Sequence, residues 1–455
     1  MGAKQWILAM LMGLMSLPAV RSQSEEVPSY RYFIDLLHST SKSKTEASLD
    51  QIEQEWEESF ELYAVETLYF LDESQAFSRL LLLLQDKTGE GFGVDFNAWY
   101  AYLWNKDPMY DEDYFSFKAA LHAPIDRRFV SYFFGREAQS EIRLDEVRWG
   151  GVKQDGIPPL RNPTMIEASK ARYLSNSDVV FGIEVNGEAR AYPKRILAWH
   201  ELFTDRIGNT PVAGVYCTLC GTVILYKTQH DGHTYELGTS GFLYRSNKLM
   251  YDRETQSLWN TLWGQPVLGP LAGKGIQLEY LSVVTTTWGT WKRQHPDTKV
   301  LSLQTGHRRD YSEGAAYRDY FATDQLMFNV PTNDRRLKNK QEVLVIRLPE
   351  ETDEAIAISS KYLRKNPIYG GTIDGKSFTV FTDKSDAHRA FFTQGYSFVS
   401  YDKNGIATDS DGGEWLVTEG KLKRTTGERS LPRLHTFNGF WFGVRAAFPT
   451  IQLIP

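Results

Sequence analysis

The hydrophobic positions in the first third of the chain recur with the period of an α-helix. From about residue 48 to residue 134, apolar residues fall at three- and four-residue steps, as one buried face of an amphipathic helix requires. A run of five leucines, residues 80–84, predicts a helix that is buried on most sides. The pattern predicts a helical domain over residues 23–148, packed either like a helical repeat or as an irregular helical subdomain.

After a turn-rich segment at residues 149–160, the pattern changes to short runs of alternating apolar residues. Asn186-Gly187 and Asp231-Gly232 predict two-residue hairpins, because both central positions of a type I′ turn need a positive φ. The sequence therefore predicts an α+β protein, a helical domain followed by a mostly-β region. The strands expected from the alternation are residues 179–185, 212–217, 223–226 and 234–237.

The β region contains two similar stretches, residues 179–303 and 342–454. Leu281, Trp288 and Pro296 have the same spacing as Leu434, Trp441 and Pro449. The segment from Asp252 to Trp259 likewise resembles the segment from Asp409 to Trp415. The alternative is that the two stretches converged independently on similar strand-forming sequences rich in Trp, Gly and Pro. Duplication predicts two related lobes, residues 149–335 with the cysteines and residues 336–455 without them.

The first 22 residues have the pattern of a signal peptide. Lys4 precedes an apolar run from Trp6 to Leu17, and Ser22 allows cleavage before Gln23. The alternatives are an uncleaved anchor or a buried N-terminal helix. The run is too short to span a bilayer, so no stable membrane insertion is expected. We expect a periplasmic or secreted protein.

Length and charge narrow the class of protein. At 455 residues the chain is long enough for two or three domains. Its net charge is −6, with both signs interspersed and no basic stripe. Nucleic acid is therefore not an expected partner.

The two cysteines of the chain, Cys217 and Cys220, lie three residues apart and are followed by Gly221. A secreted chain that uses disulfides for stability usually spreads several cysteines through its sequence, so this pair indicates a site. Apolar β-branched residues follow the pair, which predicts strand rather than the helix of a thioredoxin-like motif. A strand, Cys-x-x-Cys-Gly and a second strand is the shape of a metal knuckle, and two thiolates suit zinc or copper.

The remaining metal ligands must come from elsewhere in the chain. Among nine histidines, His200 lies just before the cysteine strand and is the expected third ligand. His307 is a second candidate, and Met250 is a weaker one. His122 lies in the helical region and is expected at the surface.

A polar constellation downstream supplies further candidates for catalysis. Tyr244, Asp252 and Arg253 carry hydrogen-bonding groups close together in sequence, and an Asp-Arg pair beside thiolates would orient a ligand or tune a proton transfer. The alternative is a buried network that fixes two β elements.

At these residues the chain resembles a family known as domain of unknown function 3179, over about residue 150 to the C-terminus. The family name implies no particular activity. Family members typically have Pro where this chain has Thr218, so the turn is less rigid here. The helical part lies outside the resemblance. The segments that carry it include Asp155-Gly156-Ile157-Pro158, Trp199-His200-Glu201, Tyr216-Cys217-Thr218-Leu219-Cys220-Gly221, Gly241-Phe242-Leu243-Tyr244 and Met250-Tyr251-Asp252-Arg253.

Three hypotheses follow. The first is a mononuclear copper or zinc site on Cys217, Cys220 and His200, in a metal-dependent redox enzyme or a metal-handling protein that takes a small molecule or metal ion. The second is a thiol–disulfide oxidoreductase with Cys217 as nucleophile and Cys220 as the resolving cysteine. The third is a non-enzymatic module in which the pair closes a structural disulfide and the helical domain binds a protein partner.

Overall fold

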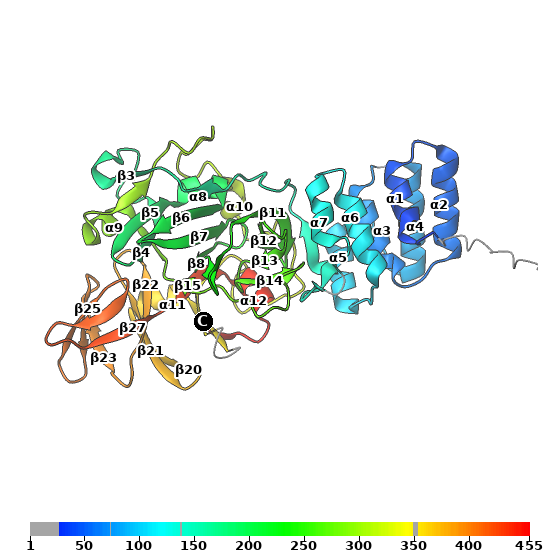
Figure 1. Cartoon of the computed structure of the whole chain (residues 1–455). Helices are drawn as coiled ribbons and strands as arrows, with labels where there is room; N and C mark the ends of the chain where they lie inside the picture. The colour runs from blue at the N-terminus through cyan, green and yellow to red at the C-terminus, as the bar shows by residue number, and fades with distance from the viewer. Residues whose placement is uncertain (1–26, 73, 137–138, 349–353) are drawn as a thin grey trace, which may run out of the picture.

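The computed structural model describes residues 27–72, 74–136, 139–348 and 354–455. The expected signal peptide, residues 1–22, lies outside the described residues. The N-terminal part of the described chain is helical and extends from one side of a larger β region (Figure 1). No helix in the described ranges is both long and apolar enough to cross a membrane.

The N-terminal helices pack against their neighbours in sequence and also against helices further along the chain. Short polar residues begin several of them. The Ser74 hydroxyl accepts from the Phe77 amide and the Asp95 carboxylate from the Ala98 amide, so each satisfies a free N–H of the first turn. The helices are α1 (Tyr30–His38), α2 (Lys42–Gln54), α3 (Phe60–Phe70), α4 (Gln75–Thr88), α5 (Phe96–Lys106), α6 (Glu112–His122) and α7 (Val130–Phe133).

Two details of the helical prediction are wrong. The leucine run of α4 buries only Leu80 and Leu84, while Leu82 is 66% exposed, because α4 packs through one face. His122 is buried rather than exposed, since its ring packs against Phe242 from the β region. These contacts make the helical core continuous with the first β sheet.

The β region contains several sheets. One antiparallel sheet joins the helical part and has the order β1 (Val147–Trp149), β11 (Leu237–Tyr244), β12 (Asn247–Asp252), β13 (Leu258–Asn260) and β14 (Gln265–Leu268). A second has the order β16 (Val284–Thr287), β4 (Val179–Val185), β5 (Glu188–Pro193), β17 (Lys299–Leu301) and β3 (Met165–Glu167). A small hairpin consists of β9 (Gln229–His230) and β10 (His233–Thr234).

The largest sheet contains strands from both halves of the β region. Its order is β2 (Leu160–Arg161), β6 (Leu202–Ile207), β7 (Thr210–Cys217), β8 (Thr222–Lys227), β28 (Thr436–Phe440), β18 (Glu342–Arg347), β19 (Ala355–Ser359) and β29 (Gln452–Ile454), with β15 (Tyr280–Leu281) also beside β8. The last sheet has the order β20 (Ile368–Ile373), β21 (Lys376–Thr382), β22 (His388–Phe392), β27 (Ser430–Leu434), β26 (Lys421–Arg424), β25 (Glu414–Val417), β24 (Ile406–Asp409) and β23 (Phe398–Tyr401).

Short helices follow or connect these strands. They are α8 (Lys194–His200), α9 (Trp288–Gln294), α10 (Arg318–Ala322), α11 (Ser360–Lys365) and α12 (Trp441–Ala447). Both predicted hairpins are present, with positive φ at Asn186-Gly187 between β4 and β5 and at Asp231-Gly232 between β9 and β10.

The two halves of the β region have the same topology. In the first, β16 and β4 are antiparallel, β4 and β5 are antiparallel, and β5 and β17 are parallel. In the second, β28, β18, β19 and β29 repeat these three pairings in the same order. A short helix and a three-stranded meander follow in each, α8 with β6–β8 and α11 with β20–β22. The internal resemblance in sequence therefore corresponds to two related structural units.

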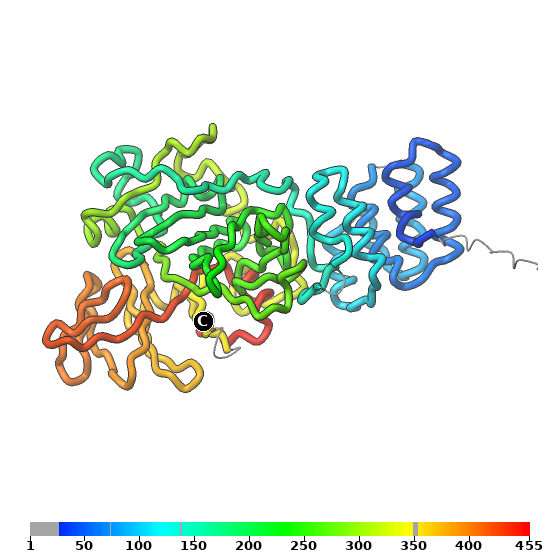
Figure 2. Tube along the Cα trace, in the orientation of Figure 1, coloured from blue at the N-terminus to red at the C-terminus, as the bar shows by residue number. Residues whose placement is uncertain are grey.

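The units are interlocked. Strand β8 of the first unit pairs with β28 of the second, and β16 of the first lies against β22 of the second. In Figure 2 the C-terminal segment, drawn in red, returns to lie against the central strands of the first unit. This return brings α12 to the loop that carries the cysteines.

Candidate functional site

The cysteines lie in the tight connection between β7 and β8, as the strand pattern predicts. Cys217 ends β7 and is paired with Thr222 at the start of β8. The two sulfurs form a disulfide, with the Cα atoms 5.6 Å apart. Gly221 has a φ of +60°, and a Cβ there would lie 2.7 Å from the Phe440 ring, so this position requires glycine.

Three hydrogen bonds hold successive residues of this loop. The Thr218 hydroxyl donates to Glu201 Oε1 at 2.6 Å. The Tyr320 hydroxyl donates to the Leu219 carbonyl at 2.7 Å, and the Phe440 amide donates to the Cys220 carbonyl at 2.7 Å. Because the partners come from three separate segments, the loop is fixed in place whatever the state of the sulfurs.

Both cysteines are buried, and Cys217 lines a pocket. Cys217 is 2% exposed and lines a small pocket of about 60 Å³. Cys220 is fully buried beneath α12, where a Cβ on Gly443 would come within 2.8 Å of the Cys220 Cβ. Cys217 is therefore the cysteine that borders this pocket.

A buried ion pair shares this pocket. Glu201, which caps α8 in a left-handed conformation, and Lys248 of β12 both line it and are only 3% and 7% exposed. Lys248 Nζ contacts Glu201 Oε2 directly, and the Tyr317 hydroxyl donates to Glu201 Oε1 at 3.1 Å. Burial lowers the pKa of Lys248 well below its usual value. A lysine whose pKa is lowered gives up its proton more readily than a lysine in water.

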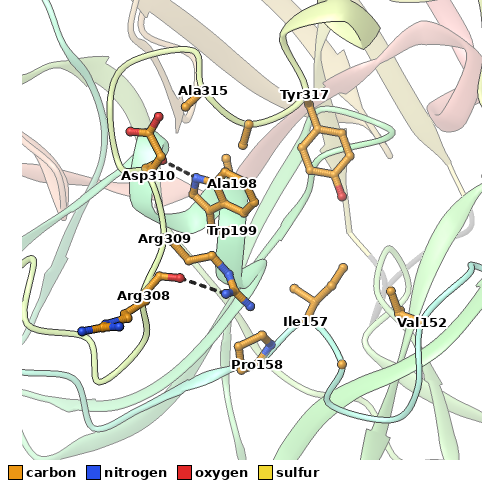
Figure 3. Close-up of a pocket in the computed structure, with 12 residues that line it drawn as sticks. Val152, Ile157, Pro158, Ala198, Trp199, Arg308, Arg309, Asp310, Ala315 and Tyr317 are labelled. Atoms are coloured by element: carbon orange, nitrogen blue, oxygen red, sulfur yellow. Dashed lines mark hydrogen bonds between the residues drawn. The ribbon is translucent and has the colours of Figure 1, made fainter.

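A larger pocket of about 630 Å³ adjoins the small one. Val152, Ile157 and Tyr317 line both, so the two share a wall. Figure 3 shows Trp199 and Arg309 on one side of the larger pocket and Tyr317 and Ile157 on the other. Tyr317 therefore lies between the larger pocket and the Glu201 carboxylate.

The expected metal ligand His200 has both ring nitrogens engaged by other partners. Its Nδ1 lies 2.9 Å from the Pro158 carbonyl and its Nε2 lies 2.6 Å from the Tyr311 hydroxyl. Burial lowers its pKa to about 4, so it is a neutral imidazole with both nitrogens engaged. His307, the second candidate, packs beside it with ring centroids 5.2 Å apart.

In the part of the chain that the structure describes, no three His, Cys, Asp or Glu side chains are placed to hold a metal ion. The additional ligands expected for copper or zinc are thus not assembled around Cys217 and Cys220. Met250, the thioether candidate, is buried in a hydrophobic core to which both units contribute.

Asp252 belongs to a structural loop. Its carboxylate accepts from the Thr255 and Ser257 amides and from the Trp259 indole. In the second unit Asp409 accepts in the same way from the Trp415 indole, at 2.9 Å. The unit without cysteines has the same network. This supports the alternative interpretation of the segment, in which Asp252 holds β elements in place.

Arg253 and Tyr244 also lie away from the cysteines. Arg253 is exposed and pairs with Glu236 at 2.6 Å. Tyr244 is buried in the core shared with the helices, where burial raises its pKa. The structure therefore does not place these catalytic candidates around the sulfurs.

The charged residues of the site, Glu201 and Lys248, were not among the predicted site residues. Lys248 gave only a weak signal, as a charged residue next to the apolar run Leu249-Met250-Tyr251. Glu201 follows His200 in a segment that carries the family resemblance. Tyr317 comes from a long irregular segment with no periodic pattern.

The sequence matches a family model over residues 154–451, and the chain belongs to this family, described as protein of unknown function (DUF3179). The match confirms the resemblance, and it contains the cysteine loop, Glu201, Lys248 and both repeated units. Comparison with curated proteins and with solved structures found no match. Helices α1–α7 precede the matched region.

Proposed function

We propose that the protein is a thiol–disulfide oxidoreductase that acts on small molecules through the Cys217–Cys220 pair. One observation carries the proposal: Cys217 and a buried Lys248–Glu201 pair line the same pocket. A structural disulfide has no need of a buried ion pair beside it, and such a pair is costly to bury. Its presence supports chemistry at the sulfurs.

The reaction transfers two electrons. The thiolate of a small thiol attacks Cys217 Sγ, the bond to Cys220 Sγ breaks, and a mixed disulfide forms on Cys217 while Cys220 leaves as a thiolate that takes up a proton. A second thiol then attacks the substrate sulfur of the mixed disulfide. The products are the substrate disulfide and the Cys217 thiolate, which is protonated in turn. A small disulfide regenerates the pair by the reverse steps.

The buried pair has a role in both steps. The thiolate is the reactive form of cysteine, so each step moves a proton to or from a sulfur. Lys248, whose pKa is lowered by burial, would supply a proton to the pocket that Cys217 lines as the disulfide is reduced. Thr218 and Tyr317 both donate to Glu201, which holds the carboxylate in position for Lys248. The proposed setting is an oxidising one, the periplasm or the extracellular space, where such a pair is normally oxidised.

The test compares thiol content, metal content and reactivity in the full-length protein. We expect metal-free protein with one disulfide that small thiols reduce and small disulfides re-form. Cys217→Ser and Cys220→Ser should each abolish the cycle. Copper or zinc bound stoichiometrically and lost in these variants would overturn the proposal in favour of a metal site. A disulfide that small thiols reduce only after unfolding would overturn it in favour of a structural role.

A further inference from the structure

The larger pocket beside the cysteine site has mostly apolar walls. Trp199, Ile157 and Pro158 form much of its surface, together with small alanine side chains. The Trp199 indole is fixed by donating to the Asp310 carbonyl at 2.7 Å. A volume of about 630 Å³ is large enough for a small organic molecule.

One cation in this pocket has unused hydrogen-bonding capacity. The Arg309 guanidinium lies between Trp199 and Pro158 in Figure 3, 5.9 Å from the Trp199 ring centre. Its Nη1 donates to the Arg308 carbonyl at 2.9 Å, and no carboxylate in the described ranges pairs with it. By contrast, Arg195 of the neighbouring α8 has two carboxylate partners, Asp178 and Glu313.

Neither of the two other charged residues of the pocket forms an ion pair with the Arg309 guanidinium. The Asp310 carboxylate accepts from the Ser312 amide at 2.9 Å and points away from the Arg309 guanidinium (Figure 3). The Arg308 side chain extends out of the pocket in the same view. Among the described residues, Arg309 is therefore an exposed guanidinium with no carboxylate partner, and it lines a pocket with mostly apolar walls.

We infer that this pocket binds the substrate, and that the substrate is a small thiol carrying a carboxylate, which Arg309 holds. The inference rests on the proposed function and names its substrate class. A planar guanidinium matches a carboxylate through two parallel hydrogen bonds, and the apolar walls match a hydrocarbon body. With the carboxylate at Arg309, the substrate thiol would approach Cys217 from the side of Tyr317, which lines both this pocket and the small pocket of Cys217.

Binding is tested without any thiol chemistry. Isothermal titration calorimetry would compare 3-phenylpropanoate with its neutral analogue 3-phenylpropanamide on the oxidised full-length protein. We expect the anion to bind about tenfold more tightly than the amide, and Arg309→Ala to remove that preference, as the loss of a charge-assisted hydrogen bond requires. Arg364→Ala, at an exposed arginine of α11, is the matched control and should keep it. Equal binding of the two compounds, or an unchanged preference in Arg309→Ala, would overturn the inference.

Reactivity separates this inference from the proposed function. The rate of disulfide reduction by 3-mercaptopropionate is divided by the rate with neutral 2-mercaptoethanol, so that general effects on the fold cancel. We expect Arg309→Ala to lower this ratio about tenfold and Arg364→Ala to leave it unchanged. Reduction with an unchanged ratio in Arg309→Ala would refute the substrate class and leave the oxidoreductase standing. Arg309-dependent binding with no reduction by either thiol would refute the oxidoreductase and leave an anion-binding pocket.

Discussion

The two structural units place different chemistry in equivalent loops. In the first unit the loop between β7 and β8 carries the Cys217–Cys220 disulfide and faces a pocket. In the second unit the loop between β21 and β22 begins with Asp383, which pairs with Arg389 at 2.8 Å. Arg389 in turn pairs with Glu419 at 2.6 Å, and all three side chains are buried. The arrangement of strands is the same, while one loop is built for access and the other for internal pairing.

This difference separates scaffold from site. Features present in both units, such as the Asp–Trp pairs at Asp252 and Asp409, stabilise the common framework. Features that surround the cysteine loop and are absent from the second unit are the candidates for function. Glu201 caps α8 where the second unit has Asn366 after α11, and the cysteine pair has no equivalent in the second unit.

The largest expected effect comes from removing the central cation of the second loop. Arg389→Ala leaves Asp383 and Glu419 buried without their partner, so the free energy of unfolding should fall by about 3–5 kcal/mol. Urea denaturation of the full-length protein measures it, with Arg364→Ala as an exposed control. A loss below about 1 kcal/mol would show that the second loop is not held by these pairs.

The second prediction tests whether Asp252 and Asp409 have the same structural role. Asp252→Ala and Asp409→Ala each leave an indole N–H and backbone amides without an acceptor, so each should lower the free energy of unfolding by about 2–3 kcal/mol. Where the variants remain folded, disulfide reduction should be as fast as in the wild type. A rate loss of about a hundredfold confined to Asp252→Ala would instead make Asp252 a catalytic group.

The stability of the protein should depend on pH through His388 in the second unit. Burial lowers the pKa of this histidine to about 3, with further effects from Asp383, Arg364 and Arg389. Because the unfolded histidine binds a proton near pH 6.5, its contribution to stability is present above that pH and is lost as the pH falls toward 3. Between pH 6.5 and pH 4.5 the free energy of unfolding of wild type should fall by about 2 kcal/mol more than that of His388→Gln. Exposed His233→Gln is the control, and identical pH profiles for His388→Gln and wild type would contradict this assignment.

The smallest expected change in stability follows from removing both cysteines. The disulfide closes a loop of four residues, so its chain-entropy contribution is at most about 2 kcal/mol. Cys217→Ser combined with Cys220→Ser should therefore remain folded in urea titrations while losing all reaction with thiols. A double variant that fails to fold would mark the disulfide as a structural part of the unit.

The sequence predicts those features that depend on local pattern. Hairpins at Asn186-Gly187 and Asp231-Gly232 follow from the backbone needs of single turns, and the helical region follows from its periodicity. The repeat was visible because tryptophans such as Trp288 and Trp441 keep their places at the start of equivalent helices.

The site itself depends on tertiary contacts that local pattern does not contain. Glu201 and Lys248 are 47 residues apart, and their pairing follows from how β12 lies against the end of α8. His200 was expected near the cysteines because it precedes their strand, yet its ring is held by Pro158 and Tyr311. Position in the sequence therefore indicated which segment lies near the site. It did not indicate where the side chains of that segment are directed.

The most direct test of the account is a redox titration of the cysteine pair. Full-length protein is equilibrated with 3-mercaptopropionate and its disulfide at a series of ratios, from both the oxidised and the reduced side, and free thiols are alkylated and counted by mass spectrometry. The account predicts one reversible two-electron transition in folded protein, and in Cys220→Ser a mixed disulfide trapped on Cys217. A pair that stays oxidised at every ratio until the protein unfolds, with no adduct on Cys217, would contradict it.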